Sequence, residues 1–195
     1  MTEEFLFQIT VLGTPAEEAA GRNINLIHAG AFTDMDLVFT APAAQQDASF
    51  LLALTIAEVT VKDHGKASLR EVEIIYPTQT YFNILPNATL ASMFASNEEA
   101  LGIEFPKPPG NFSSSTDFGN VSFIVPGLHP FFYIGTDALN HTEEYADAAG
   151  AKKAQLHTLR TAKALVMTAV DAVCCPDLLQ QERDDFSLAK PKQEK

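Results

Sequence analysis

Short apolar runs with strand character alternate with helical segments along this chain. Each run is rich in β-branched or aromatic residues and ends near a Gly or Pro that favours a turn; the runs cover residues 7–12, 37–41, 121–125 and 131–135. Helical patterns cover residues 23–31, 87–102 and 151–173. This alternation predicts an α/β fold in which helices cover the faces of a sheet.

Two of these helices carry clear end signals. Asn87 is a favourable N-cap, and the helix after it places Leu90, Met93, Phe94 and Leu101 on one face before Gly102 ends it. The helix over 151–173 ends before Pro176 and has apolar residues at three- and four-residue steps, namely Leu159, Ala162, Val166, Ala169, Val170 and Val173. Residues 41–49 and 106–115 are predicted loops, and residues 180–195 a charged tail that frays.

Composition and charge exclude several classes of protein. The 195 residues carry a net charge of −12 with no run of Lys or Arg, which argues against a nucleic-acid binder and against attraction to an anionic membrane surface. The first residues are acidic, unlike a secretory signal, and no apolar run reaches the roughly 18 residues that a membrane span needs. We therefore expect a cytoplasmic protein with one α/β domain over residues 1–179, and with Cys174 and Cys175 as reduced thiols.

Two places in the sequence carry candidate chemistry. Glu17 and Glu18 follow the first predicted strand; one could hold a metal while the other acts as a general base, although two acids at a helix N-terminus are the commoner explanation of such a pair. His141 follows a predicted strand and a loop, where sites on α/β sheets usually form. None of the five histidines has a metal-ligand spacing, and neither a phosphate-binding Gly-rich loop nor a nucleophile elbow is present.

Three motifs, in this order, resemble those of the zinc aminoacylase and carboxypeptidase superfamily, peptidase family M-twenty, and within it the β-alanyl-lysine dipeptidase type. They are Val-Leu-Gly-Thr-Pro-Ala-Glu-Glu at 11–18, Ser-Thr-Asp-Phe-Gly-Asn-Val-Ser at 115–122 and Asn-His-Thr-Glu at 140–143. The resemblance covers residues 8–66 and then continues from residue 72. It implies the catalytic-domain core of a zinc exopeptidase fold without its lid and dimerisation domain.

The resemblance also implies a role for each matching residue. Glu17 would be the general base, and Glu18 and His141 would be zinc ligands, with Asp117 in a supporting position at the substrate site. The cofactor would be zinc, which polarises a carbonyl and lowers the pKa of a bound water. The reaction would be hydrolysis of the amide bond of a dipeptide or an N-acyl amino acid.

The chain departs from the family pattern at several points. The family's Cys-Gly-His ligand cluster before the first strand has no match, and residues 39–42 lack the His that the family places after the second strand. The lid domain that should follow residues 65–68 is skipped, and Leu69 stands where the family has a substrate-contacting His. The junction is expected at residues 66–75.

Two recognised ligands are fewer than the three or so that catalytic zinc needs. We therefore expect a truncated relative with weak or no activity. Three alternatives remain. The chain is an active hydrolase that recruits Asp34, Asp36 or Asp47 as a ligand; it is a non-catalytic protein that binds a full-length homologue; or it folds poorly because the shortened sheet exposes an edge.

Overall fold

The computed structural model describes residues 7–14, 21–48, 52–53, 79–104, 113–114 and 116–190. These ranges contain helices and short parallel strands, so the α/β class predicted from the sequence is confirmed. In chain order the elements are α2 (Arg22–His28), β1 (Val38–Phe39), β2 (Ala43–Ala44), β3 (Leu52–Ala53), α3 (Ala88–Ala100), β4 (Ser113–Ser114), α4 (Phe118–Ser122), β5 (Gly127–Leu128), β6 (Phe132–Tyr133), α5 (Glu143–Ala149), α6 (Lys152–Cys174) and α7 (Pro176–Ala189).

The central strands form one parallel pairing that is interrupted in the middle. Val38 of β1 lies opposite Gly127 of β5, and Ala43 of β2 lies opposite Phe132 of β6, so both ladders keep the same register. The ladder breaks between them because the N–H and C=O groups of Phe131 bond to Ala48 instead, at 2.8 and 3.0 Å. The third parallel pair joins β3 to β4.

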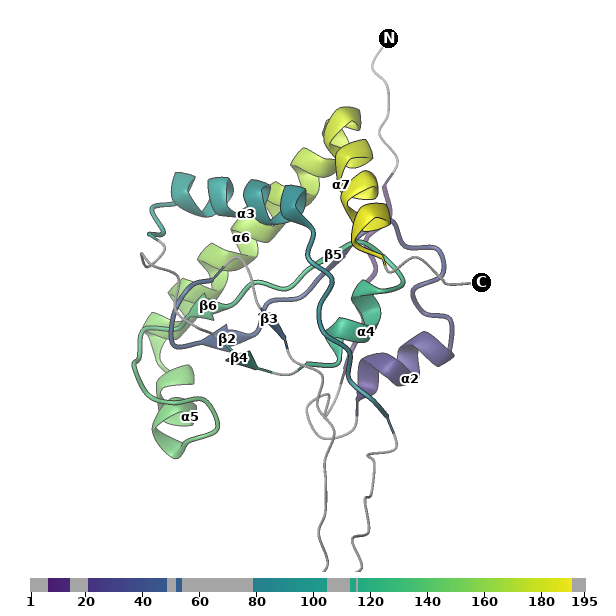
Figure 1. Cartoon of the computed structure of the whole chain (residues 1–195). Coiled ribbons are helices and arrows are strands. Elements are labelled where there is room, and N and C mark those ends of the chain that lie inside the picture. Colours follow the sequence, from purple (N-terminus) through teal and green to yellow (C-terminus); the bar gives the residue numbers. More distant parts are fainter. Residues whose placement is uncertain are drawn as a thin grey trace, which may run out of the picture.

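Helices cover both sides of these strands, as Figure 1 shows: α3, α6 and α7 lie on one side, and α2 and α4 on the other. The core divides in the same way. On the α2 and α4 side, Val38 packs against a cluster of Phe32, Phe118, Val121 and Val125. On the other side, Phe39 packs against Leu90, Phe94, Leu128 and Ala164. Neighbouring residues of β1 thus face opposite layers, as the pleat of a strand requires.

The predicted helix signals at α3 are confirmed. The side chain of Asn87 accepts a hydrogen bond from the N–H of Leu90 at 3.0 Å, and Gly102 takes a left-handed φ of 76° just after the helix. The helix α7 also stabilises the N-terminal end of α3, because Asp185 accepts hydrogen bonds from the N–H and the hydroxyl of Thr89 at 2.9 and 2.8 Å. Most of the predicted charged tail is therefore helix packed against α3.

Two predicted strands are wrong. Residues 7–12 form no strand, and Ile9 and Val11 are 77% and 90% exposed. Residues 121–125 belong to α4 and the turn after it; Val121 and Val125 are four positions apart and both buried, which is helical spacing. Conversely, the strands β2 and β4 lie in segments that the sequence predicts as loops.

The length of α6 is predicted correctly, but its buried face is not. The buried face is made of small residues, Ala154, Thr161, Ala164, Thr168 and Ala172. Ala164 packs against Leu90 and Phe94 of α3, and Ala154 packs against Phe132 of β6. The predicted apolar stripe instead points outward, with Leu159, Val166 and Val170 at 67%, 62% and 48% exposure.

Among the helices that the structure describes, none has the length and apolar content needed to cross a membrane.

Candidate functional site

The Asn-His-Thr-Glu motif forms a tightly held loop between β6 and α5. The side chain of Asn140 donates to the carbonyl of Ala43 at 3.2 Å, which ties the loop to β2. Thr142 caps α5 by accepting a hydrogen bond from the N–H of Tyr145 at 3.2 Å. His141, between them, is exposed and has a φ of 65°, the only positive φ of a non-glycine residue in the described ranges.

A left-handed backbone at a residue other than Gly costs roughly 1–2 kcal/mol and persists only where neighbouring contacts impose it. Here Asn140 and Thr142 impose it, and they hold His141 on an exposed turn after a parallel strand. The expectation that His141 belongs to a site at the sheet edge, as a zinc ligand, stays a prediction.

Asp117 is buried at the start of α4 and is fully engaged by one residue. Its two carboxylate oxygens accept hydrogen bonds from the backbone N–H and the side-chain amide of Asn23, at 2.8 and 2.6 Å. Burial raises the pKa of Asp117, and the bonds from Asn23 act in the opposite direction. The contact joins the beginnings of α2 and α4, so in this structure Asp117 positions two helices.

Other residues of the same motif clamp the segment that precedes α3. Asn120 accepts from the N–H of Phe82 at 3.1 Å and donates to the carbonyl of Thr80 at 2.9 Å. Ser122 accepts from the N–H of Leu85 at 2.9 Å. Gly119 leaves no room for a side chain, because a Cβ there would overlap the carbonyl of Phe82. The residue types of this motif are therefore explained by packing as well as by the resemblance.

Glu17 and Glu18 lie outside the described residues, so their predicted roles as base and ligand stay predictions. The described chain resumes at Gly21, which has a left-handed φ of 56° and precedes α2. Asn23, which binds Asp117, follows the glutamate pair in the sequence. The Asp117 contact thus fixes Asn23, at the beginning of α2.

The three acids considered as recruited ligands lie in different surroundings. Asp34 is exposed, and Asp36 accepts a hydrogen bond from Arg183 at 2.8 Å in an exposed ion pair. Asp47 is half-buried and accepts from the N–H of Tyr133 at 2.9 Å. Among the described residues, no three His, Cys, Asp or Glu side chains gather as metal ligands. Because Glu17 and Glu18 are not among the described residues, the zinc site implied by the resemblance stays a prediction.

A polar cluster that the sequence did not reveal lies between α3, α6 and the loop after β2. Glu98 is fully buried, and its carboxylate has no hydrogen-bond partner among the described residues. Burial, and secondarily the nearby Asp47, raises its pKa to about 8, while Arg160 acts in the opposite direction. One feature of the sequence indicates that Glu98 is buried: it follows the core residue Phe94 by one helical turn, on the same face of α3.

His129 is also buried and serves the core. Its ring packs between those of Phe118 and Phe131, with centroids 5.1 and 5.3 Å away. Burial lowers its pKa to about 4, so the ring is neutral near pH 7.

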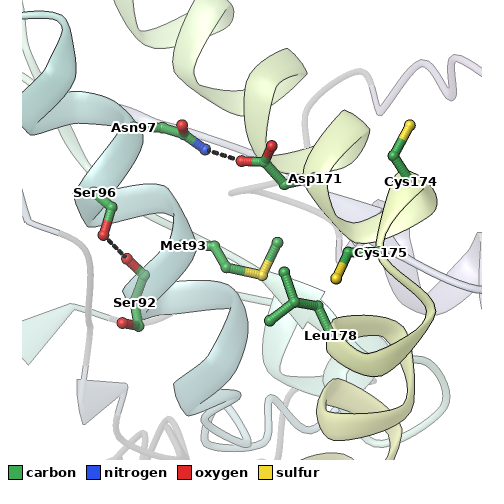
Figure 2. A pocket seen from close by; sticks show the side chains of 8 residues that line it. All are labelled: Ser92, Met93, Ser96, Asn97, Asp171, Cys174, Cys175 and Leu178. Atoms are coloured by element: carbon green, nitrogen blue, oxygen red, sulfur yellow. Dashed lines mark hydrogen bonds between the residues drawn. The ribbon is translucent and has the colours of Figure 1, made fainter.

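A cavity of about 330 Å³ opens between α3, α6 and α7 (Figure 2). Met93 and Cys175 point toward each other across it, and Asn97 donates to Asp171 at 2.9 Å along one side. Both Cys174 and Cys175 are free thiols, as the sequence predicts. The residues that line the cavity include none of those to which the resemblance assigns a role.

Comparison with known proteins gives two informative relatives. No family model matches the sequence. The Xaa-Arg dipeptidase of Mus musculus is 37% identical over 92% of this chain, and that of Homo sapiens is 35% identical over 93%. The chain spans 62% of the length of each of these two relatives.

The alignments also contain a large gap. The alignment with the mouse protein is 268 positions long, whereas 92% of 195 residues is about 179 residues. Within the aligned region, roughly 89 residues of the mouse protein therefore have no counterpart in this chain. Along nearly its whole length, this chain is similar to mammalian Xaa-Arg dipeptidases and lacks an internal portion of their sequence.

Proposed function

We propose that the chain carries the catalytic-domain scaffold of a dipeptidase of the peptidase M-twenty type, specific for dipeptides with a basic C-terminal residue. The observation that carries this proposal is the similarity to two Xaa-Arg dipeptidases over more than nine-tenths of the chain. A β-alanyl-lysine substrate, implied by the motif resemblance, belongs to the same class, because both substrates end in a cationic side chain.

The structure supports this proposal at two of the four proposed site residues. His141 lies on an exposed left-handed turn after β6, as a ligand at a sheet edge would. Asp117 joins α4 to the helix that follows the Glu17 and Glu18 segment, as a positioning residue would. In the proposed site Glu17 is the general base, and Glu18 and His141 bind zinc. Zinc, when bound, would supply carbonyl polarisation and an activated water.

We propose further that this chain retains little of that activity. Catalytic zinc takes about three protein ligands, and the motif resemblance assigns only two here, Glu18 and His141. The roughly 89 positions of the relative without a counterpart indicate that an internal portion is missing, and the motif resemblance assigns this loss to the lid domain near residues 66–75. Without a lid, the substrate would lose contacts that orient its amide bond.

The test is hydrolysis by the purified full chain, supplied with zinc, of three dipeptides: alanyl-arginine, β-alanyl-lysine and alanyl-glutamate. Product amines are quantified by chromatography. We expect cleavage of the two basic dipeptides at rates just above the blank, no cleavage of the acidic dipeptide, and loss of the residual rate in Glu17→Gln. Glu144→Gln, in the exposed first turn of α5, is the matched control and should leave the rate unchanged.

Two outcomes would contradict the proposal in different ways. Equal cleavage of all three dipeptides, or a rate unaffected by Glu17→Gln, would remove the assigned substrate class and base. Rapid turnover that Glu17→Gln abolishes would confirm the dipeptidase and disprove the loss of activity.

A second candidate function is a non-catalytic protein that binds a full-length homologue. The observation that favours it is the exposed apolar face of α6. Mixing the purified chain with a full-length Xaa-Arg dipeptidase and separating the mixture by gel filtration tests it: co-elution is expected for a binding protein, and separate elution is expected otherwise.

A further inference from the structure

The helix α6 has two apolar faces. One is the buried face of small residues that packs against α3 and β6. The other, which we call the outer face, carries Leu156, Leu159, Ala162, Val166, Ala169, Val170 and Val173. A helix that is apolar on both sides normally lies between two packing partners, because apolar surface is stabilised by removal from water.

The outer face is largely open to solvent. Leu156 and Leu159 are 69% and 67% exposed, and Val166 is 62% exposed. Leu159, Ala162, Val166, Ala169 and Val173 follow one another at alternating steps of three and four residues, which is the spacing of a seam that packs against a second helix. The small side chains of Ala162 and Ala169 allow that helix to approach closely.

The charges along the outer face determine what kind of helix fits it. At 100° per residue, Lys152 and Lys163 fall on this face, and both are exposed. The only acid in α6 is Asp171, which bonds to Asn97 on the α3 side. The outer face is therefore apolar with positive charge, on a chain whose net charge is −12.

This charge pattern argues against a second copy of the chain as the occupant. Pairing two outer faces would bring lysines together with no acid on either face to compensate them. An occupant with carboxylates beside an apolar stripe would instead complement both features. Lys152 and Lys163 are eleven residues apart, about 16 Å along the axis, so two acids separated by the same three turns would meet them.

We propose that the outer face of α6 is a docking site for an amphipathic helix of a partner protein, with an apolar stripe flanked by Asp or Glu. This proposal does not depend on whether the chain hydrolyses dipeptides. If the chain is a non-catalytic binding protein, its partner would need such an acidic amphipathic helix.

The test uses two designed, labelled helical peptides with Leu and Ala at the seam positions. One peptide carries Glu at two positions eleven residues apart, and its twin carries Lys there. Binding to the full chain is measured by fluorescence anisotropy. We expect the Glu peptide to bind about tenfold more tightly than the Lys peptide, because two attractive charge pairs replace two repulsive ones.

Three variants of exposed residues test the same surface. Val166→Glu should weaken binding of both peptides at least tenfold, and Lys163→Glu should weaken the Glu peptide and strengthen the Lys peptide. Leu188→Glu, at an 84% exposed apolar residue of α7, is the control and should change neither. Circular dichroism melts check that every variant is folded.

Several results would overturn the proposal. Equal affinity for the two peptides, or no binding of either, would remove the acidic helix as occupant. Unchanged binding in Val166→Glu would remove the outer face as the site. A dimer in light scattering that Val166→Glu disrupts would assign the face to a second copy. Binding to vesicles of mixed neutral and anionic lipid that Val166→Glu abolishes would assign it to a membrane surface.

Discussion

Replacing Glu98 by Gln should stabilise the protein, and the gain should grow with pH. Glu98 is fully buried, and its pKa is raised to about 8 from an ordinary 4.5, with burial as the main cause. Between these two values the folded chain holds a proton that the unfolded chain releases. Stability therefore falls as pH rises from about 4.5 to about 8 and levels off above that.

The size of the effect follows from the two pKa values. Each unit of pH within the window costs about 1.4 kcal/mol, so the wild type loses on the order of 3 kcal/mol by pH 7 and on the order of 5 kcal/mol by pH 8. Domains of this size are typically stable by about 5–15 kcal/mol, so the loss is a large share of the total. Gln has nearly the shape of the protonated acid and cannot ionise, so Glu98→Gln should avoid this cost.

The assay is urea unfolding of the wild type and of Glu98→Gln at half-unit steps from pH 4 to pH 8.5. The two free energies of unfolding should agree near pH 4 and diverge by about 3 kcal/mol at pH 7. Glu99→Gln, at the exposed neighbour on α3, is the matched control and should follow the wild type within about 0.5 kcal/mol. A difference between wild type and Glu98→Gln that is the same at every pH, or a less stable Glu98→Gln at pH 8, would refute the reasoning.

Three further changes have expected outcomes. Glu182→Gln should behave in the same way over a narrower window, because burial raises the pKa of Glu182 to about 7; urea titrations should show the stability gain level off above pH 7, and a gain still rising at pH 8 would contradict it. Gly119→Ala should lower the melting temperature by several degrees, because the added Cβ overlaps the Phe82 carbonyl. An unchanged melting temperature would contradict the close contact between α4 and the segment around Phe82. Asn87→Ala should lower the free energy of unfolding in urea by about 1–2 kcal/mol. The variant loses the cap of α3 and the hydrogen bond that the Asn87 side chain donates to the Glu182 carbonyl at 2.9 Å. Ser96→Ala, on the exposed side of the same helix, is the control and should have little effect.

Local signals in the sequence predicted the helix ends well. The cap at Asn87 and the left-handed Gly102 act over a few residues, so they are visible without knowledge of the rest of the chain. The face that α6 buries was not predictable in the same way. Ala164 is buried against Leu90 and Phe94 of α3, and the small residues of this face give a weaker hydrophobic signal than the Leu and Val residues of the opposite face.

The candidate site was predicted from motif resemblance rather than from local pattern. The structure accounts for the residue types at Asn140, Thr142 and Asp117 through specific hydrogen bonds. The buried acid Glu98 was missed because its charge suggested an exposed position, although its spacing from Phe94 indicated the core.

The most direct test of the central claim, that this chain keeps a dipeptidase scaffold without a complete metal site, is its zinc stoichiometry. Metal-free protein is dialysed against micromolar zinc, passed through gel filtration, and analysed by mass spectrometry for zinc per chain. We predict well under one zinc ion per chain, with a further decrease in His141→Ala. One or more zinc ions retained per chain, reduced by Glu18→Gln and His141→Ala, would contradict the claim and show that the chain completes the site.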